Sequence, residues 1–134
     1  ACTTIAMGVF WRLFIGSVIM LVGGYLGEAG FINATLGFVI GMAGWIYILY
    51  EIFAGEAGKV SASDAPAAVQ SGFSTMRWIV TIGWAIYPIG YFVGYMAGGA
   101  DANSLNMIYN IADVLNKIGF CLAIWAAADS TAKA

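Results

Sequence analysis

Residues 105–125 read LNMIYNIADVLNKIGFCLAIW, an apolar stretch with one acid, Asp113, and one base, Lys117, near its centre. A helix of about 20 apolar residues crosses the hydrocarbon core of a bilayer, which is roughly 30 Å thick. The four-residue spacing puts both charged side chains on one helix face, where the acid offsets the cation. Each charge costs about 2.5–3.5 kcal/mol at mid-membrane on insertion scales, so we expect the pair to face a bundle interior and to have a function. A purely structural ion pair is the alternative interpretation.

The composition of the whole chain indicates a membrane protein. Of its 134 residues, 62% are hydrophobic and 9% are charged, whereas about a quarter of the residues of a soluble domain are charged. The net charge of −2 leaves no basic patch for nucleic acid. The absence of histidine excludes histidine-ligated metals, bis-histidine haem and histidine-based catalytic triads. The sequence also lacks a nucleophile–base pair, so we expect a protein that is not an enzyme and holds no metal.

Runs without charge define three further membrane spans. They cover residues 13–27, 29–50 and 78–100. The sequence therefore predicts an all-α membrane protein, one domain over residues 1–134, with transmembrane helices at about 5–27, 31–54, 66–98 and 103–128. Pro66 suits the first turn of the third helix, and Ser63 or Asp64 could cap it.

The four basic residues other than Lys117 fall on one side of this arrangement. They are Arg12, Lys59, Arg77 and Lys133, while the two joints on the other side carry Glu28 and Asp101 and no base. Basic residues flank membrane spans on the cytoplasmic side. The pattern predicts that the chain enters from the cytoplasm and that its C-terminus returns there.

The third predicted helix carries a line of rings. Trp84, Tyr87 or Pro88, and Tyr91 share one helix face, and Pro88 removes a backbone hydrogen bond and can bend the helix. Similar spacing places Met20 and Gly24 on one face of the first helix, and Phe38, Gly41 and Trp45 on one face of the second. Packing alone would explain the line of rings, but the adjacent lysine favours a binding pocket there. The faces of the first and second helices by themselves indicate only that they are packed.

Lys117 has the chemistry needed for a covalent bond to an aldehyde. Desolvation favours the neutral amine, which is the nucleophile in Schiff-base formation. The protonated imine then needs a carboxylate counter-ion, and Asp113 is the nearest candidate.

Four motifs together resemble the microbial rhodopsins, and among them the proteorhodopsins. They are NIADVLNK at 110–117, GWAIYP at 83–88, MLVGGYLGEAG at 20–30 and ILYEIFAGE at 48–56. The first is similar to the last helix of that family and the second to its penultimate helix. The resemblance implies a seven-helix bundle of which this chain holds the C-terminal four helices. We therefore expect three N-terminal helices to belong to the same protein.

The resemblance also implies roles for individual residues. Lys117 would bind all-trans retinal as a protonated Schiff base, and Asp113 would be a counter-ion oriented partly by Tyr87. The remaining positions implied for the retinal pocket are Trp84, Tyr87, Pro88, Tyr91, Met20, Gly24, Phe38, Gly41, Trp45 and Asn116.

The function that the resemblance implies is light-driven outward proton transport across a bacterial inner membrane. Tilting of the third helix about Pro88 would open the cytoplasmic half-channel. The protein would lie in the lipid bilayer with its C-terminus in the cytoplasm, bind no nucleic acid and form rings of protomers. A photosensory rhodopsin and a chloride or sodium pump are alternatives that share the pocket. A chromophore-free four-helix subunit, with Asp113 and Lys117 as an assembly ion pair, is a different class.

Overall fold

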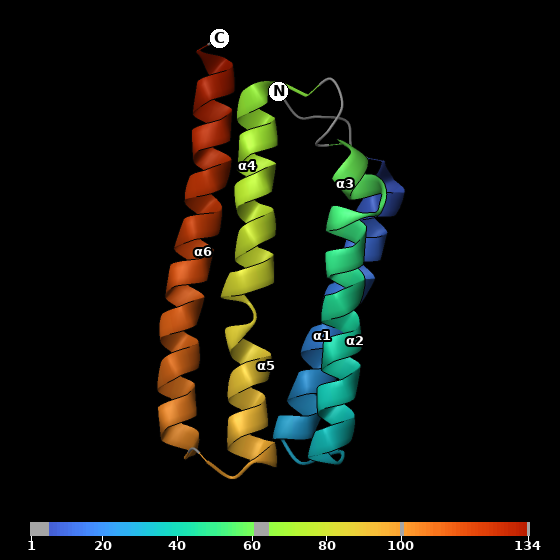
Figure 1. The fold of residues 1–134 in the computed structure, drawn as a ribbon, viewed down its shortest axis with the longest axis vertical. Coiled ribbons are helices and arrows are strands. Elements are labelled where there is room, and N and C mark those ends of the chain that lie inside the picture. The colour runs from blue at the N-terminus through green and yellow to red at the C-terminus, as the bar shows by residue number, and fades with distance from the viewer. Residues whose placement is uncertain (1–5, 61–64, 100, 134) are drawn as a thin grey trace.

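The computed structural model describes residues 6–60, 65–99 and 101–133, and these residues form helices joined by short turns (Figure 1). The elements are α1 (Met7–Glu28), α2 (Ala34–Phe53), α3 (Glu56–Val60), α4 (Ala67–Trp78), the π-helical segment η1 (Ile79–Gly83), α5 (Ile86–Tyr91), a second π-helical segment η2 (Phe92–Met96) and α6 (Ala102–Ala132). Within the described ranges there is no strand. The predicted all-α architecture is confirmed.

Four helices are long and apolar enough to cross a membrane. They are Met7–Glu28, Ala34–Lys59, Ala67–Met96 and Ala102–Ala132. The predicted four spans are therefore present. The expected start at Ile5 and the expected caps Ser63 and Asp64 lie outside the described residues, and Pro66 is the residue that precedes the first turn of α4.

The last helix continues beyond the predicted end at residue 128. Its final turn includes Asp129, and Nζ of Lys133, the residue after the helix, lies 2.6 Å from Asp129 Oδ2. Alanines and an ion pair at four-residue spacing both favour a helix. The end of apolar sequence is therefore not the end of α6.

Helices α1 and α2 form a hairpin packed on glycine. A Cβ atom added to Gly37 would lie 2.6 Å from the Cα atom of Gly27, and one added to Gly44 would lie 2.6 Å from the backbone nitrogen of Met20. Small residues at such a contact allow two backbones to approach closely. The hairpin stands beside a second pair, formed by α6 and the third span (Figure 1).

The third span is not a regular helix. Its π-helical segment η1 ends at Gly83, and α5 begins only at Ile86. The ring of a proline clashes with the carbonyl four residues earlier, and for Pro88 that residue is Trp84. The irregularity therefore lies one turn before the proline, where the ribbon of the third span opens (Figure 1).

One end of the hairpin is held by charge. Arg12 of α1 donates hydrogen bonds to Glu51 of α2, at 3.1 Å, and to Glu56 of α3, at 2.5 Å. The Glu51 residue is 3% exposed, so a buried carboxylate is matched by a cation. The short helix α3 is thereby fixed to both long helices.

Candidate functional site

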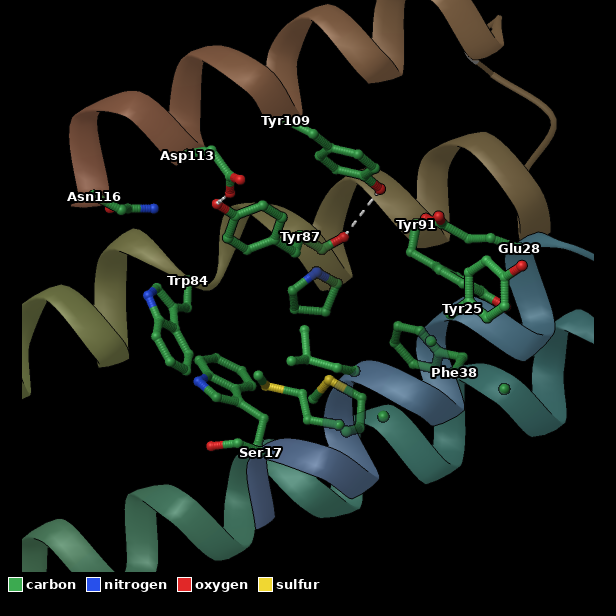
Figure 2. Close-up of a pocket in the computed structure, with 18 of the residues that line it drawn as sticks. Ser17, Tyr25, Glu28, Phe38, Trp84, Tyr87, Tyr91, Tyr109, Asp113 and Asn116 are labelled. Carbon is green, nitrogen blue, oxygen red and sulfur yellow. Dashed lines mark hydrogen bonds between the residues drawn. The ribbon is translucent and has the colours of Figure 1, made fainter. Parts of the chain in front are cut away.

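A cavity of about 760 Å³ separates the α1–α2 hairpin from α5 and α6. All four spans contribute to its walls. Figure 2 shows Trp84, Tyr87 and Tyr91 of the third span facing Ser17 and Phe38 of the hairpin across this space. The walls are mostly carbon, so the cavity suits an apolar ligand.

The structure places every predicted site residue at this cavity. They are Met20, Gly24, Phe38, Gly41, Trp45, Trp84, Tyr87, Pro88, Tyr91, Asp113, Asn116 and Lys117. Ten lining residues were not predicted: Ser17, Leu21, Tyr25, Glu28, Gly37, Met42, Tyr109, Asn110, Phe120 and Cys121. Most lie three or four residues from a predicted one on the same helix, so extending each helix face by one turn would have found them.

Asp113 is the centre of the polar part of the cavity. Lys117 Nζ donates to Asp113 Oδ2 at 2.5 Å, and the Tyr87 hydroxyl donates to Asp113 Oδ1. Both carboxylate oxygens therefore have a partner, one from its own helix and one from the third span. Figure 2 shows the carboxylate turned toward the phenol.

The charged pair is less enclosed than the sequence predicts. The side chain of Lys117 is 75% exposed and that of Asp113 is 43% exposed. The four spans place the pair at the edge of the cavity, and they do not give it the dry setting expected for an amine in a bundle interior. The difference arises because burial depends on all the helices around a site, whereas spacing along one helix gives only its face.

The predicted line of rings forms one wall. The Tyr87 and Tyr109 rings are 5.6 Å apart, and the Tyr109 hydroxyl donates to the backbone oxygen of Tyr87 at 3.3 Å. The Tyr91 hydroxyl donates to the backbone oxygen of Ala34 at 2.9 Å, which ties the third span to the start of α2. These contacts hold the rings against rotation.

The opposite wall is built around two small residues. A Cβ atom added to Gly24 would meet no atom within 4 Å, and one added to Gly41 would meet the Met20 backbone oxygen at 3.4 Å. The missing side chain of Gly24 therefore widens the cavity. Trp45 closes one end, where its indole nitrogen donates to the backbone oxygen of Val80 at 3.0 Å.

The donor set suits an organic group better than a metal ion. Within the described ranges, no group of three or more His, Cys, Asp or Glu side chains could hold a metal. The site instead offers an amine beside a carboxylate at the end of an apolar slot. That combination can bind an elongated apolar aldehyde covalently and balance a positive charge on the nitrogen.

Comparison with known proteins gives matches over nearly the whole chain. The family model described as bacteriorhodopsin-like protein matches residues 3–131. The green-light absorbing proteorhodopsin of Gamma-proteobacterium EBAC31A08 is 52% identical over 93% of this chain and 50% of its own length. The blue-light absorbing proteorhodopsin of Gamma-proteobacterium Hot 75m4 is 50% identical over the same shares. The chain thus spans about half the length of these curated relatives.

Solved structures show the same likeness. The crystal structure of blue light-absorbing proteorhodopsin from Med12 matches with a TM-score of 0.78 at 49% identity, over 94% of this chain and 57% of that one. The crystal structure of Exiguobacterium sibiricum rhodopsin matches with a TM-score of 0.83 at 35% identity, over 100% of this chain and 63% of that one.

Proposed function

Because the chain belongs to the bacteriorhodopsin-like protein family, we propose that it is the C-terminal part of a retinal-binding, light-driven outward proton pump. The observation that carries this proposal is the Lys117 amine beside the Asp113 carboxylate, at the edge of an apolar cavity walled by rings. The relatives named as proteorhodopsins support the choice of a pump.

The residues present fit retinal, which is a long apolar aldehyde. Lys117 would hold it covalently, and the rings of Trp84, Tyr87 and Tyr91 would flank its chain from the third span. Gly24 and Gly41 leave room on the opposite wall. When bound to Lys117 as a protonated Schiff base, all-trans retinal would supply visible-light absorption and photoisomerisation.

The polar residues have separate tasks in this proposal. Asp113 balances the positive charge at the lysine nitrogen, and its hydrogen bond from Tyr87 keeps the carboxylate turned into the cavity. An acid that already accepts two hydrogen bonds is a fixed counter-ion, so we assign the pumped proton's acceptor to another part of the protein.

The direction of transport follows from the orientation. Helix α3 and the end of α6 lie at one end of the molecule (Figure 1). Lys59 belongs to α3, and Lys133 directly follows α6. We propose that this end is cytoplasmic, that the membrane is the bacterial inner membrane, and that the complete bundle assembles as a ring of protomers. Movement of the third span at its break would open a path from the cytoplasmic end.

Chemical trapping tests the covalent bond. We expect borohydride reduction of the complete, retinal-reconstituted protein to leave a retinyl group on Lys117, located by mass mapping. Lys117→Ala should abolish the visible band. Lys133→Ala is the matched control, because Lys133 pairs with Asp129 in the same i,i+4 geometry at the far end of α6. A visible band retained in Lys117→Ala would refute the proposal.

Recording of pH under light tests transport. Illuminated cells that express the complete protein should acidify the medium, and a protonophore should abolish the change. A pigment that absorbs light without any pH change would point to a photosensor. A pH change of opposite sign that a protonophore enhances would point to a pump of another ion.

A further inference from the structure

Pro88 leaves one backbone carbonyl of the third span without its helical donor. Because proline has no N–H, the Trp84 oxygen accepts instead from the Tyr87 nitrogen, at 3.2 Å. In a regular helix the Tyr87 nitrogen would donate to the Gly83 oxygen. The Gly83 oxygen accepts instead from the side-chain amide of Asn116 on α6, at 3.0 Å.

A second carbonyl is freed one turn earlier. The Trp84 nitrogen donates to the Ile79 oxygen, five residues back, at 3.1 Å. It therefore does not donate to the Val80 oxygen, as it would in a regular helix. The indole of Trp45 on α2 supplies that bond at 3.0 Å. The Val80 and Gly83 carbonyls of the break therefore each accept a hydrogen bond from a side chain of a neighbouring helix.

The Asn116 side chain also packs closely against the backbone of Gly83. A Cβ atom added to Gly83 would lie 3.0 Å from Asn116 Cγ and closer still to the amide oxygen. The absence of a side chain at Gly83 thus allows the amide to reach the carbonyl. The two residues form a matched pair across α6 and the third span.

We infer that Asn116 is a positioning residue that connects the lysine helix to the break in the third span, with Trp45 as a second support from α2. Asn116 adjoins Lys117 in sequence, and the break carries Trp84, whose ring lines the cavity. A displacement of the backbone at the lysine is passed directly to the point where the third span is interrupted. This coupling deepens the proposed function and rests on it for its kinetic consequence.

The inference predicts a specific change in the dark state. Asn116→Leu keeps the branched four-atom skeleton of the side chain but removes the donor. In solid-state NMR of the complete reconstituted protein, the Gly83 carbonyl signal should move upfield while that of Val80 stays in place. Trp45→Phe should give the reverse. Asn106→Leu is the control, because Asn106 lies on the same helix, is exposed and does not line the cavity.

The kinetic prediction follows from the same bond. In the fraction of Asn116→Leu protein that forms a pigment, recovery of the resting absorption after a flash should slow by up to about tenfold, the rate effect of one hydrogen bond. Gly83→Ala should act in the same way, because its new methyl group displaces the amide. In an Asn116→Ala background the Gly83→Ala change should have little further effect, since the space is then free.

The outcomes separate this inference from the proposed function. Failure of the unaltered protein to form a pigment would refute the proposed function, whereas the dark-state carbonyl shifts can be measured in the protein without retinal. A pigment whose Gly83 signal and flash recovery are the same in Asn116→Leu as in Asn106→Leu would overturn the inference. Additive effects of Gly83→Ala and Asn116→Ala would also overturn it.

Discussion

Asp113 illustrates how one carboxylate can be fixed by two different elements. It accepts from Lys117 on its own helix and from Tyr87 on the third span. If Asp113 is the counter-ion, as we propose, two partners fix its distance from the lysine nitrogen, and the energy of light absorption by a charged chromophore depends on that distance.

We predict that Asp113→Asn shifts the visible band to longer wavelength or reduces the fraction of protonated pigment. The amide keeps the shape of the carboxylate but removes the negative charge that stabilises the cation at Lys117. Absorption spectra of the reconstituted protein would measure the change. Asp129→Asn is the control, because Asp129 pairs with Lys133 outside the cavity. An unchanged spectrum and photocycle in Asp113→Asn would show that this acid is not a counter-ion.

Single residues at the site could be predicted where the signal was a spacing or a motif. The i,i+4 pair, the line of rings and the family motifs led to twelve residues that the structure brings to one cavity. The bond from Asn116 to Gly83 could not be predicted, because it depends on which carbonyl the proline leaves free. Exposure of Lys117 could not be predicted either, since it depends on the helices around it.

At the scale of elements, capping residues determine where a span begins, and glycine contacts determine how closely two spans pack. Asp101 caps α6: its Oδ1 accepts from the backbone nitrogens of Asn103 and Ser104, both at 3.0 Å, and its Oδ2 accepts from the Ser104 hydroxyl at 2.6 Å. The hydrogen bond from the Ser104 hydroxyl, followed by the backbone bonds, lowers the pKa of the Asp101 carboxyl.

We predict that the first turn of α6 is ordered at neutral pH and loosens in acid. A carboxyl whose pKa is lowered by folding stabilises the fold above its unfolded pKa of about 3.9, and this contribution is lost as pH falls through the folded value. The amide signals of Asn103 and Ser104, followed by NMR between pH 7 and pH 2, would report the order of this turn. Asp101→Ala should show the loosened turn already at neutral pH. A first turn equally ordered in both proteins at every pH would contradict this prediction.

We predict that Gly44→Ala destabilises the α1–α2 hairpin. Its Cβ atom would lie 2.6 Å from the Met20 backbone nitrogen and 2.8 Å from the Gly16 backbone oxygen, so the helices must separate. The cost of such overpacking is about 1–3 kcal/mol. Thermal unfolding in detergent would measure it. Gly8→Ala is the control on α1, where the new atom meets only the Arg12 side chain at 3.5 Å. Equal stability of the two variants would contradict the close backbone contact.

The elements themselves could be predicted from charge-free runs because a bilayer imposes a minimum span length. Their irregularities could be predicted less well. The sequence marks Pro88 as a bend, but the interruption lies at Trp84 and Ala85, because the steric clash acts on the preceding turn. The end of α6 was set too early, since Asp129 lies inside the helix and pairs with Lys133, which directly follows it.

At the scale of the whole molecule, the distribution of basic residues predicts the orientation in the membrane. The basic end holds Arg12, bound to Glu51 and Glu56, together with Lys133 at the end of α6. We predict that an epitope tag after the C-terminus is protected from protease in spheroplasts, whose outer membrane is opened, and is cleaved after lysis. A tag between Glu28 and Asn33 should be cleaved in the spheroplasts. The opposite pattern would reverse the orientation and, with it, the proposed direction of transport.

The glycine contacts between α1 and α2 determine which parts of the molecule can move. Where two backbones touch without side chains between them, as at Gly27 and Gly37, no rotamer change can absorb a shift of one helix against the other. The hairpin is therefore a rigid body, further fixed at one end by Arg12. The third span is interrupted, and side-chain hydrogen bonds support its Val80 and Gly83 carbonyls. We therefore expect mechanical compliance to be concentrated in that span, so that a displacement at Lys117 moves the third span and leaves the hairpin in place.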